Sequence, residues 1–180
     1  MDSVASGNRW QQRHQLVLVS FLALFIAYLD RVNIAVAGIA MQESLGWSET
    51  EKGLVLSSFF IGYMAAQIIG GVLADKFGGK RVLLFSLVAW SFFTVLTPIA
   101  GSASFMALIL VRIGLGVGEA PLAPAVLSLF GKWIPENERS RAVAIFSSAA
   151  IAGTVAALVL TGLLVSRFGW QSVFYIFGIF

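Results

Sequence analysis

Five apolar stretches, each close to the length of a membrane-spanning helix, constrain this chain more than any other feature. They cover residues 16–41, 54–73, 82–100, 105–130 and 142–165, and a sixth begins near residue 172. A helix needs about 20 apolar residues to cross the hydrocarbon of a bilayer. The runs are continuous instead of alternating at every second residue, which indicates helices and not barrel strands. The sequence therefore predicts an all-α membrane protein.

Composition supports this prediction. The chain is 58% hydrophobic and 12% charged, outside the range typical of soluble domains. The net charge of +3 would suggest nucleic acid as the partner of a soluble protein. Here the basic residues stand at the ends of the apolar runs, so we expect a lipid bilayer and no nucleic acid. The chain has no cysteine, which excludes disulfides and thiolate chemistry.

The distribution of basic residues predicts the orientation in the membrane. Lysine and arginine concentrate in the N-terminal segment and in the second-to-third and fourth-to-fifth loops, whereas the other loops carry only Lys52 and Arg167. The positive-inside rule places these basic segments in the cytoplasm. We therefore expect residues 1–15 to form a cytoplasmic tail and residues 16–180 to form the transmembrane bundle. Without a recognisable leader, a prokaryotic cytoplasmic membrane is the expected location, with a processed organellar form left open.

Two helix ends share a motif, which predicts an internal repeat. GGVLADKFGGKRVL and TGLLVSRFGWQSVF align at a constant spacing of 91 positions. Each copy would contain three helices, an odd number, so the second copy would be inverted in the membrane. Inverted repeats of this kind are typical of secondary transporters. The last stretch, residues 172–180, is short, and we expect it to be a truncated sixth helix.

Asp30 and Arg31 are adjacent charged residues inside the first apolar stretch. A rise of 1.5 Å per residue from residue 16 places them about 20 Å into the membrane. A charge there costs at least ~2.5–3.5 kcal/mol unless it faces protein or water. Neighbouring residues on a helix point about 100° apart, so these two cannot form a well-aligned ion pair. Each is expected to have another partner.

Arg112 and Glu119 form a second charged pair within an apolar stretch, two helical turns apart on one face. Arg112 is expected at a depth similar to that of Arg31, with Glu119 further in. The planar fork of arginine binds carboxylate or phosphate with two parallel hydrogen bonds. Two arginines at one depth therefore predict an anion site, and nearby carboxylates could exchange protons. The alternative is a buried ion-pair network that only fixes helix packing.

Other polar, glycine and proline residues accompany these charges. Tyr28 lies one turn before Arg31, and Tyr63 lies in the second apolar stretch; either could bind a polar ligand or satisfy its hydroxyl against a neighbouring helix. Glycines at positions 114, 116 and 118 predict close helix contact. Prolines at positions 121 and 124 predict a bend just after Glu119.

The segment GGVLADKFGGKR resembles the cytoplasmic loop signature of the major facilitator superfamily. The matching residues are Gly71, Asp75, Gly78, Lys80 and Arg81. The resemblance implies a major facilitator fold, of which this chain would be the N-terminal six-helix half, made of two inverted three-helix repeats. The missing C-terminal six-helix half would then be a partner. The loop itself resembles a charge latch that stabilises one conformation.

Four further segments, YLDRVNIAVA, SSFFIGYMAAQ, RIGLGVGEAPLAPA and KWIPENERSRA, are similar to the anion:cation symporter family. That family includes sugar-acid, sialic acid, vesicular glutamate and organellar phosphate carriers. The resemblance implies that Arg31 contacts the anion and that Asp30 and Glu119 take part in proton coupling. The same resemblance implies that three further residues line the substrate site: Tyr28, Tyr63 and Arg112.

The implied function is proton-coupled symport of an organic anion, such as a sugar acid, by alternating access. No cofactor is expected apart from the coupling ion, H+ or alternatively Na+. Sodium-driven uptake of inorganic phosphate is one alternative, and a membrane sensor or assembly subunit that does not transport is another. The sequence offers no Ser-His or metal-ligand cluster, so an enzyme is not expected.

Overall fold

The computed structural model describes the backbone of residues 2–179 and the side chains of residues 12–179, and it confirms an all-α protein. No strand occurs within the described residues. The helices in chain order are α1 (Asp2–Leu45), α2 (Glu49–Phe77), α3 (Gly79–Ala103), α4 (Phe105–Glu119), α5 (Leu122–Trp133), α6 (Glu136–Phe168) and α7 (Trp170–Ile179). Five helical segments are long and apolar enough to cross a membrane, with α4 and α5 together counting as one.

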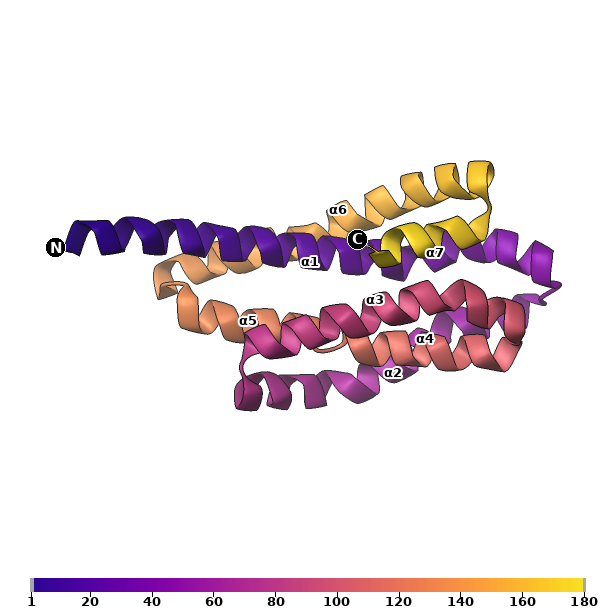
Figure 1. Cartoon of the computed structure of the whole chain (residues 1–180), viewed down its shortest axis with the longest axis horizontal. Helices are drawn as coiled ribbons and strands as arrows, with labels where there is room; N and C mark the ends of the chain where they lie inside the picture. Colours follow the sequence, from indigo (N-terminus) through magenta and orange to yellow (C-terminus); the bar gives the residue numbers. More distant parts are fainter. Residues whose placement is uncertain (1, 180) are drawn as a thin grey trace.

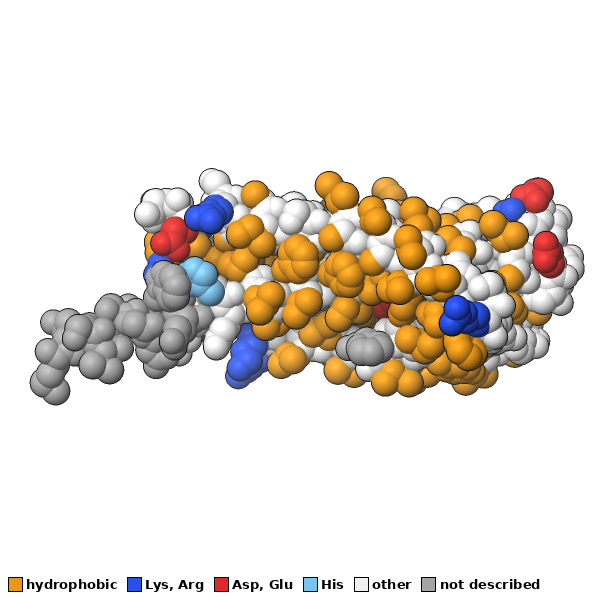
Figure 2. Space-filling model, turned by 90° about the horizontal axis from the view of Figure 1, so that it is seen from above, with side chains coloured by type: hydrophobic (Ala, Val, Ile, Leu, Met, Phe, Trp, Pro, Cys, Tyr) orange, Lys and Arg blue, Asp and Glu red, His pale blue; other side chains and the backbone are white. Residues whose placement is uncertain are grey.

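The helices form an elongated bundle with two sides (Figure 1). α1, α6 and α7 lie on one side, and α2, α3, α4 and α5 lie on the other. α1 packs most extensively against α6, whereas α4 packs against both α2 and α3. Consecutive helices α1 and α2 touch much less. Hydrophobic side chains cover most of the middle of the surface, and most of the charged ones lie toward the two ends (Figure 2), as a bilayer requires.

Two predicted helix boundaries differ from the structure. α1 begins at Asp2, so the helix continues through the predicted polar tail. Hydropathy marks the part of a helix that suits a bilayer and does not mark where its backbone hydrogen bonding starts. The predicted helix 105–130 is divided into α4 and α5 at Ala120 and Pro121, because proline has no N–H to continue the ladder. The predicted bend after Glu119 is therefore confirmed.

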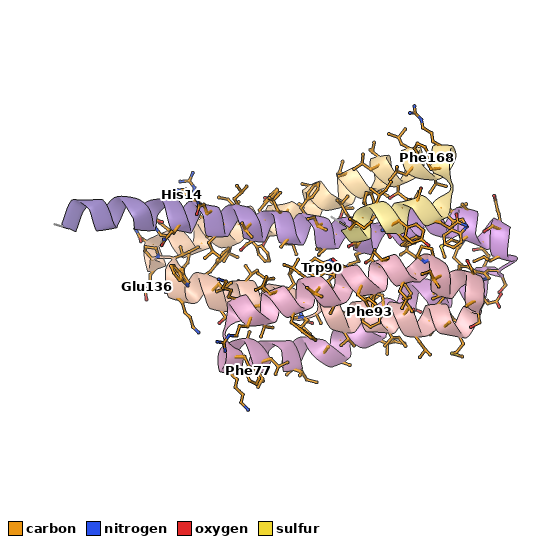
Figure 3. The ribbon with its side chains drawn as sticks, in the orientation of Figure 1. His14, Phe77, Trp90, Phe93, Glu136 and Phe168 are labelled. Atoms are coloured by element: carbon orange, nitrogen blue, oxygen red, sulfur yellow. The ribbon has the colours of Figure 1, made fainter. Side chains whose placement is uncertain are left out.

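The turns after α2 and α6 have the same construction. α2 ends at Phe77 and is followed by Gly78, with φ 86°; α6 ends at Phe168 and is followed by Gly169, with φ 80°. Residues with a Cβ rarely adopt this backbone conformation, which explains glycine at both positions. Phe77 and Phe168 lie at opposite ends of the bundle (Figure 3). The shared motif thus makes one turn at each end, as an inverted repeat requires.

Glycines let α4 approach its neighbours closely. A Cβ atom added to Gly116 would lie 2.1 Å from the carbonyl oxygen of Phe59 in α2, and one added to Gly118 would lie 3.0 Å from the backbone nitrogen of Trp90 in α3. The Ser86 hydroxyl of α3 also donates a hydrogen bond of 2.5 Å to the Gly118 carbonyl. These contacts confirm the predicted close packing and fix the position of the following residue, Glu119.

Candidate functional site

The centre of the site is an ion pair between α1 and α4. Arg31 donates a hydrogen bond through Nη2 to Oε1 of Glu119. The Glu119 side chain is 1% exposed and the Arg31 side chain is 17% exposed, so the carboxylate is buried and the guanidinium is partly accessible. Arg31 therefore finds its partner on another helix and not in Asp30, as the helical geometry predicted.

Three aromatic rings surround the Arg31 guanidinium. Its Cζ atom lies 4.8 Å from the ring centroid of Tyr28, 5.0 Å from that of Phe59 and 4.7 Å from that of Tyr63. Guanidinium groups are attracted to the faces of such rings at these separations. The structure thus brings both predicted tyrosines to Arg31, where they hold the planar group in place.

Phe59 is a site residue that the sequence did not reveal. It is fully buried, and the Cζ atom of Arg112 lies 5.4 Å from the same ring that Arg31 contacts. One aromatic ring therefore interacts with two guanidinium groups. Phe59 sits in an apolar run next to another phenylalanine, so nothing in the sequence distinguishes it from a residue that only packs against its neighbours.

Arg112 and Asp30 complete a cluster of four charged residues. Both side chains are 1% exposed, and Asp30 lies within electrostatic range of Glu119 and Arg112. Among the described residues, neither carboxylate oxygen of Asp30 and neither Nε nor Nη1 of Arg112 has a hydrogen-bond partner. Buried charged groups normally satisfy such atoms. Beside the Arg31–Glu119 pair, the cluster therefore retains unused donors of Arg112 and an Asp30 carboxylate without a hydrogen-bond partner.

The loop-signature residues lie apart from this cluster, at the end of α2 and the start of α3. Gly78 forms the turn, Gly71 lies within α2 against α5, and the side chains of Asp75, Lys80 and Arg81 are exposed. Within the described part of the chain, no ion pair involves these three charged residues. The charge latch therefore stays a prediction.

The comparisons with known proteins agree with this architecture. Residues 20–180 match the family described as the Major Facilitator Superfamily. The chain belongs to the major facilitator superfamily. A solved structure of the same shape is that of a bacterial homolog to the human lysosomal transporter Spinster, in an inward-facing and occupied conformation. The two align with a TM-score of 0.81 and 27% identity over 92% of this chain and 41% of that one.

Relatives of this major facilitator chain include two Arabidopsis thaliana proteins. One is the chloroplastic ascorbate transporter, 45% identical over 172 residues, which are 94% of this chain and 32% of that protein. The other is the chloroplastic sodium-dependent phosphate transport protein 1, 42% identical over 171 residues, which are 95% of this chain and 33% of that protein. The chain spans about a third of the length of each relative. These matches confirm the resemblance to anion carriers and fit the prediction of an N-terminal half.

Proposed function

We propose that the full-length protein is a secondary active transporter that carries a small organic anion, such as a sugar acid, in symport with protons. The observation that carries this proposal is the Arg31–Glu119 pair, which joins a partly accessible anion-binding group to a buried carboxylate within apolar helices. A charged residue within the hydrocarbon of a membrane costs free energy to insert, and such residues typically mark a substrate or ion pathway. The names of the relatives, an ascorbate transporter and a phosphate transport protein, support an anionic substrate.

The geometry suggests how proton and anion would be coupled. While Glu119 is ionised, it occupies an N–H donor of Arg31. Protonation of Glu119 removes its charge, so that the fork of Arg31 can bind the carboxylate of a substrate with two hydrogen bonds. Unused donors of Arg112, which contacts the same Phe59 ring, would add positive charge nearby. Proton and anion would therefore bind together, and the two halves of the protein would rock around them.

Sodium-driven uptake of inorganic phosphate is the second candidate. The specific observation in its favour is the 42% identity with a sodium-dependent phosphate transport protein. Arginine forks bind phosphate as well as carboxylate, so the residues of the site do not separate the two substrates.

Transport by the full-length protein in proteoliposomes would test the proposal. Inward proton and sodium gradients are imposed separately, and uptake of labelled sugar acids, ascorbate and phosphate is measured. We expect concentrative uptake of an organic anion with the proton gradient alone. Phosphate uptake that requires sodium would favour the second candidate. Binding of an anion without any countertransport would instead identify a sensor and contradict both transport assignments.

The protein is a multi-pass membrane protein, and we propose a prokaryotic cytoplasmic membrane as its location, with the N-terminus in the cytoplasm. The structure supports the orientation because the start of α1, the α2–α3 turn and the α5–α6 turn lie at one end of the bundle (Figure 1). These are the segments rich in lysine and arginine. The kind of membrane stays a prediction, since both Arabidopsis relatives are chloroplastic.

A further inference from the structure

We propose that Thr94 in α3 is a positioning residue for Asp30, whose carboxylate it holds by donating a hydrogen bond from its hydroxyl. This inference rests on the proposed proton-coupled function and adds a residue of α3 to the site. The side chains of Asp30 and Thr94 are each 1% exposed. Thr94 lies in a helix that is long and apolar enough to cross a membrane, so water cannot serve its hydroxyl freely.

α1 and α3 run in the same direction and contact each other (Figure 1). Ala27 of α1 and Trp90 of α3 belong to one buried cluster, and Trp90 lies near the middle of α3 (Figure 3). Asp30 and Thr94 follow these two residues by about one helical turn on their respective helices. The Thr94 hydroxyl accordingly lies close enough to the Asp30 carboxylate to interact with it.

The Thr94 hydroxyl is not used by its own helix. Threonine hydroxyls within helices often bond the carbonyl oxygen one turn earlier, and Thr97 does so with Phe93 at 2.9 Å. Within the described residues, neither the Thr94 hydroxyl nor either carboxylate oxygen of Asp30 has a hydrogen-bond partner of normal geometry. Buried polar groups are nearly always paired. The hydroxyl therefore supplies the donor that the carboxylate lacks.

The methyl group of Thr94 is held against α7. A Cβ atom added to Gly178 would lie 3.1 Å from Cγ2 of Thr94 and 3.0 Å from the backbone nitrogen of Val95. Glycine at position 178 thus lets α7 pack closely on α3 at this point. The methyl and the hydroxyl occupy different staggered positions on one Cβ atom. Contact of the methyl with α7 therefore turns the hydroxyl away from that helix.

The charged groups that act on Asp30 come from α4. Glu119 and Arg112 both lie within electrostatic range of it. Arg31 is its neighbour in sequence but pairs with Glu119, and the ring of Tyr63 from α2 lies against that guanidinium. The remaining stretches of the surrounding helices contain no Asp, Glu, His, Lys or Arg, namely residues 54–74, 82–104, 142–166 and 168–179.

Thr94 differs from these groups because it carries no charge. Its hydroxyl can donate to the ionised carboxylate of Asp30 and can accept a hydrogen bond from the protonated one. A hydrogen bond that favours the ionised form opposes protonation. Removal of the hydroxyl should therefore let Asp30 take up its proton at a higher pH, without any change in the charges of the cluster.

The pH dependence of uptake by the full-length protein in proteoliposomes tests this inference. Uptake of the labelled anion is measured over a series of external pH values at a constant pH difference across the membrane. Thr94→Val keeps the shape of the side chain without the hydroxyl, and its midpoint should move up by about one pH unit. Thr94→Ser keeps the hydroxyl and should restore the midpoint. Thr97→Val is the matched control, a buried threonine of α3 whose hydroxyl bonds its own helix, and should change nothing.

The outcomes separate this inference from the proposed function. Wild-type uptake that does not depend on pH would overturn the proposed function and this inference with it. If wild-type uptake depends on pH, an unshifted midpoint for Thr94→Val, an equal shift for Thr97→Val, or a failure of Thr94→Ser to restore the midpoint would overturn the inference alone. Thermal unfolding midpoints show whether each variant folds. If Thr94→Val does not fold, Thr94→Ala removes the same hydroxyl and should show the same shift.

Discussion

Arg31 in α1 and Glu119 in α4 are hydrogen-bonded across 88 positions of sequence, and the two groups differ in their access to solvent. The carboxylate is almost fully buried, while the guanidinium is partly exposed and is held by three aromatic rings. Close contact of α4 with α2 and α3 at Gly116 and Gly118 fixes the carboxylate. A ligand that reaches Arg31 would therefore compete with Glu119, and this competition underlies the first two predictions.

Arg31→Lys should weaken anion binding at least about ten-fold, a difference of about 1.4 kcal/mol. Lysine keeps the charge but lacks the planar fork that binds a carboxylate with two hydrogen bonds and stacks on Tyr28, Phe59 and Tyr63. Affinity of the full-length protein for its anion is measured by titration calorimetry. Arg167→Lys, on an exposed residue at the end of α6, is the control. Unchanged affinity of Arg31→Lys would show that only the charge at this position matters.

Glu119→Gln should leave anion binding and anion exchange intact while abolishing net uptake driven by protons. Glutamine imitates the protonated carboxyl, so Arg31 would remain available at every pH. Wild-type uptake should rise as the external pH falls, and uptake by the variant should be independent of pH. Counterflow and gradient-driven uptake are compared in the same vesicles. Uptake that keeps its dependence on pH would remove Glu119 from the coupling role.

Phe59→Leu should weaken anion binding by about three-fold or more with little loss of folding stability. Leucine remains apolar and fills much of the space, but it removes the ring that both Arg31 and Arg112 contact, and such contacts contribute about 0.5–2 kcal/mol. Phe85→Leu is the control because Phe85 is 75% exposed. If both variants bind the anion equally well, the ring of Phe59 serves packing alone.

Gly116→Ala should lower the free energy of unfolding by about 1–3 kcal/mol, because the added methyl group would meet the Phe59 backbone at 2.1 Å. Gly53→Ala is the matched helical control, since a Cβ there meets no atom within 4 Å. Gly53→Ala should leave the free energy of unfolding unchanged or raise it, because alanine favours a helical backbone more than glycine does. Thermal unfolding midpoints in detergent provide the comparison. Equal midpoints for the two variants would mean that α2 and α4 can separate at little cost.

Single cysteines should report the predicted orientation, since the sequence contains no native cysteine. Ser140→Cys lies at the basic end and Thr50→Cys at the other, and both positions are exposed. In intact cells a membrane-impermeant maleimide should label Thr50→Cys alone. After permeabilisation it should label both variants. Labelling of Ser140→Cys in intact cells would reverse the proposed topology.

Several features were predictable from the sequence because they depend on neighbouring residues. The preference of each apolar stretch for a bilayer is a sum over its own side chains, so the membrane-spanning segments were predictable. The bend at Pro121 follows from one missing backbone donor, and the divergence of Asp30 and Arg31 follows from the angle between adjacent helical residues. The start of α1 at Asp2 was missed, since a polar segment can be helical without favouring the bilayer.

The partners of these residues were decided only by the tertiary structure. Lipid and protein interior are similarly apolar, so hydropathy does not show which face of a membrane helix is buried. The packing of α1 on α6, the ion pair of Arg31 with Glu119 and the contact of Phe59 with two guanidinium groups all depend on contacts between distant segments. The sequence determined which charged groups enter the membrane, and the packing of the helices determined which of them meet.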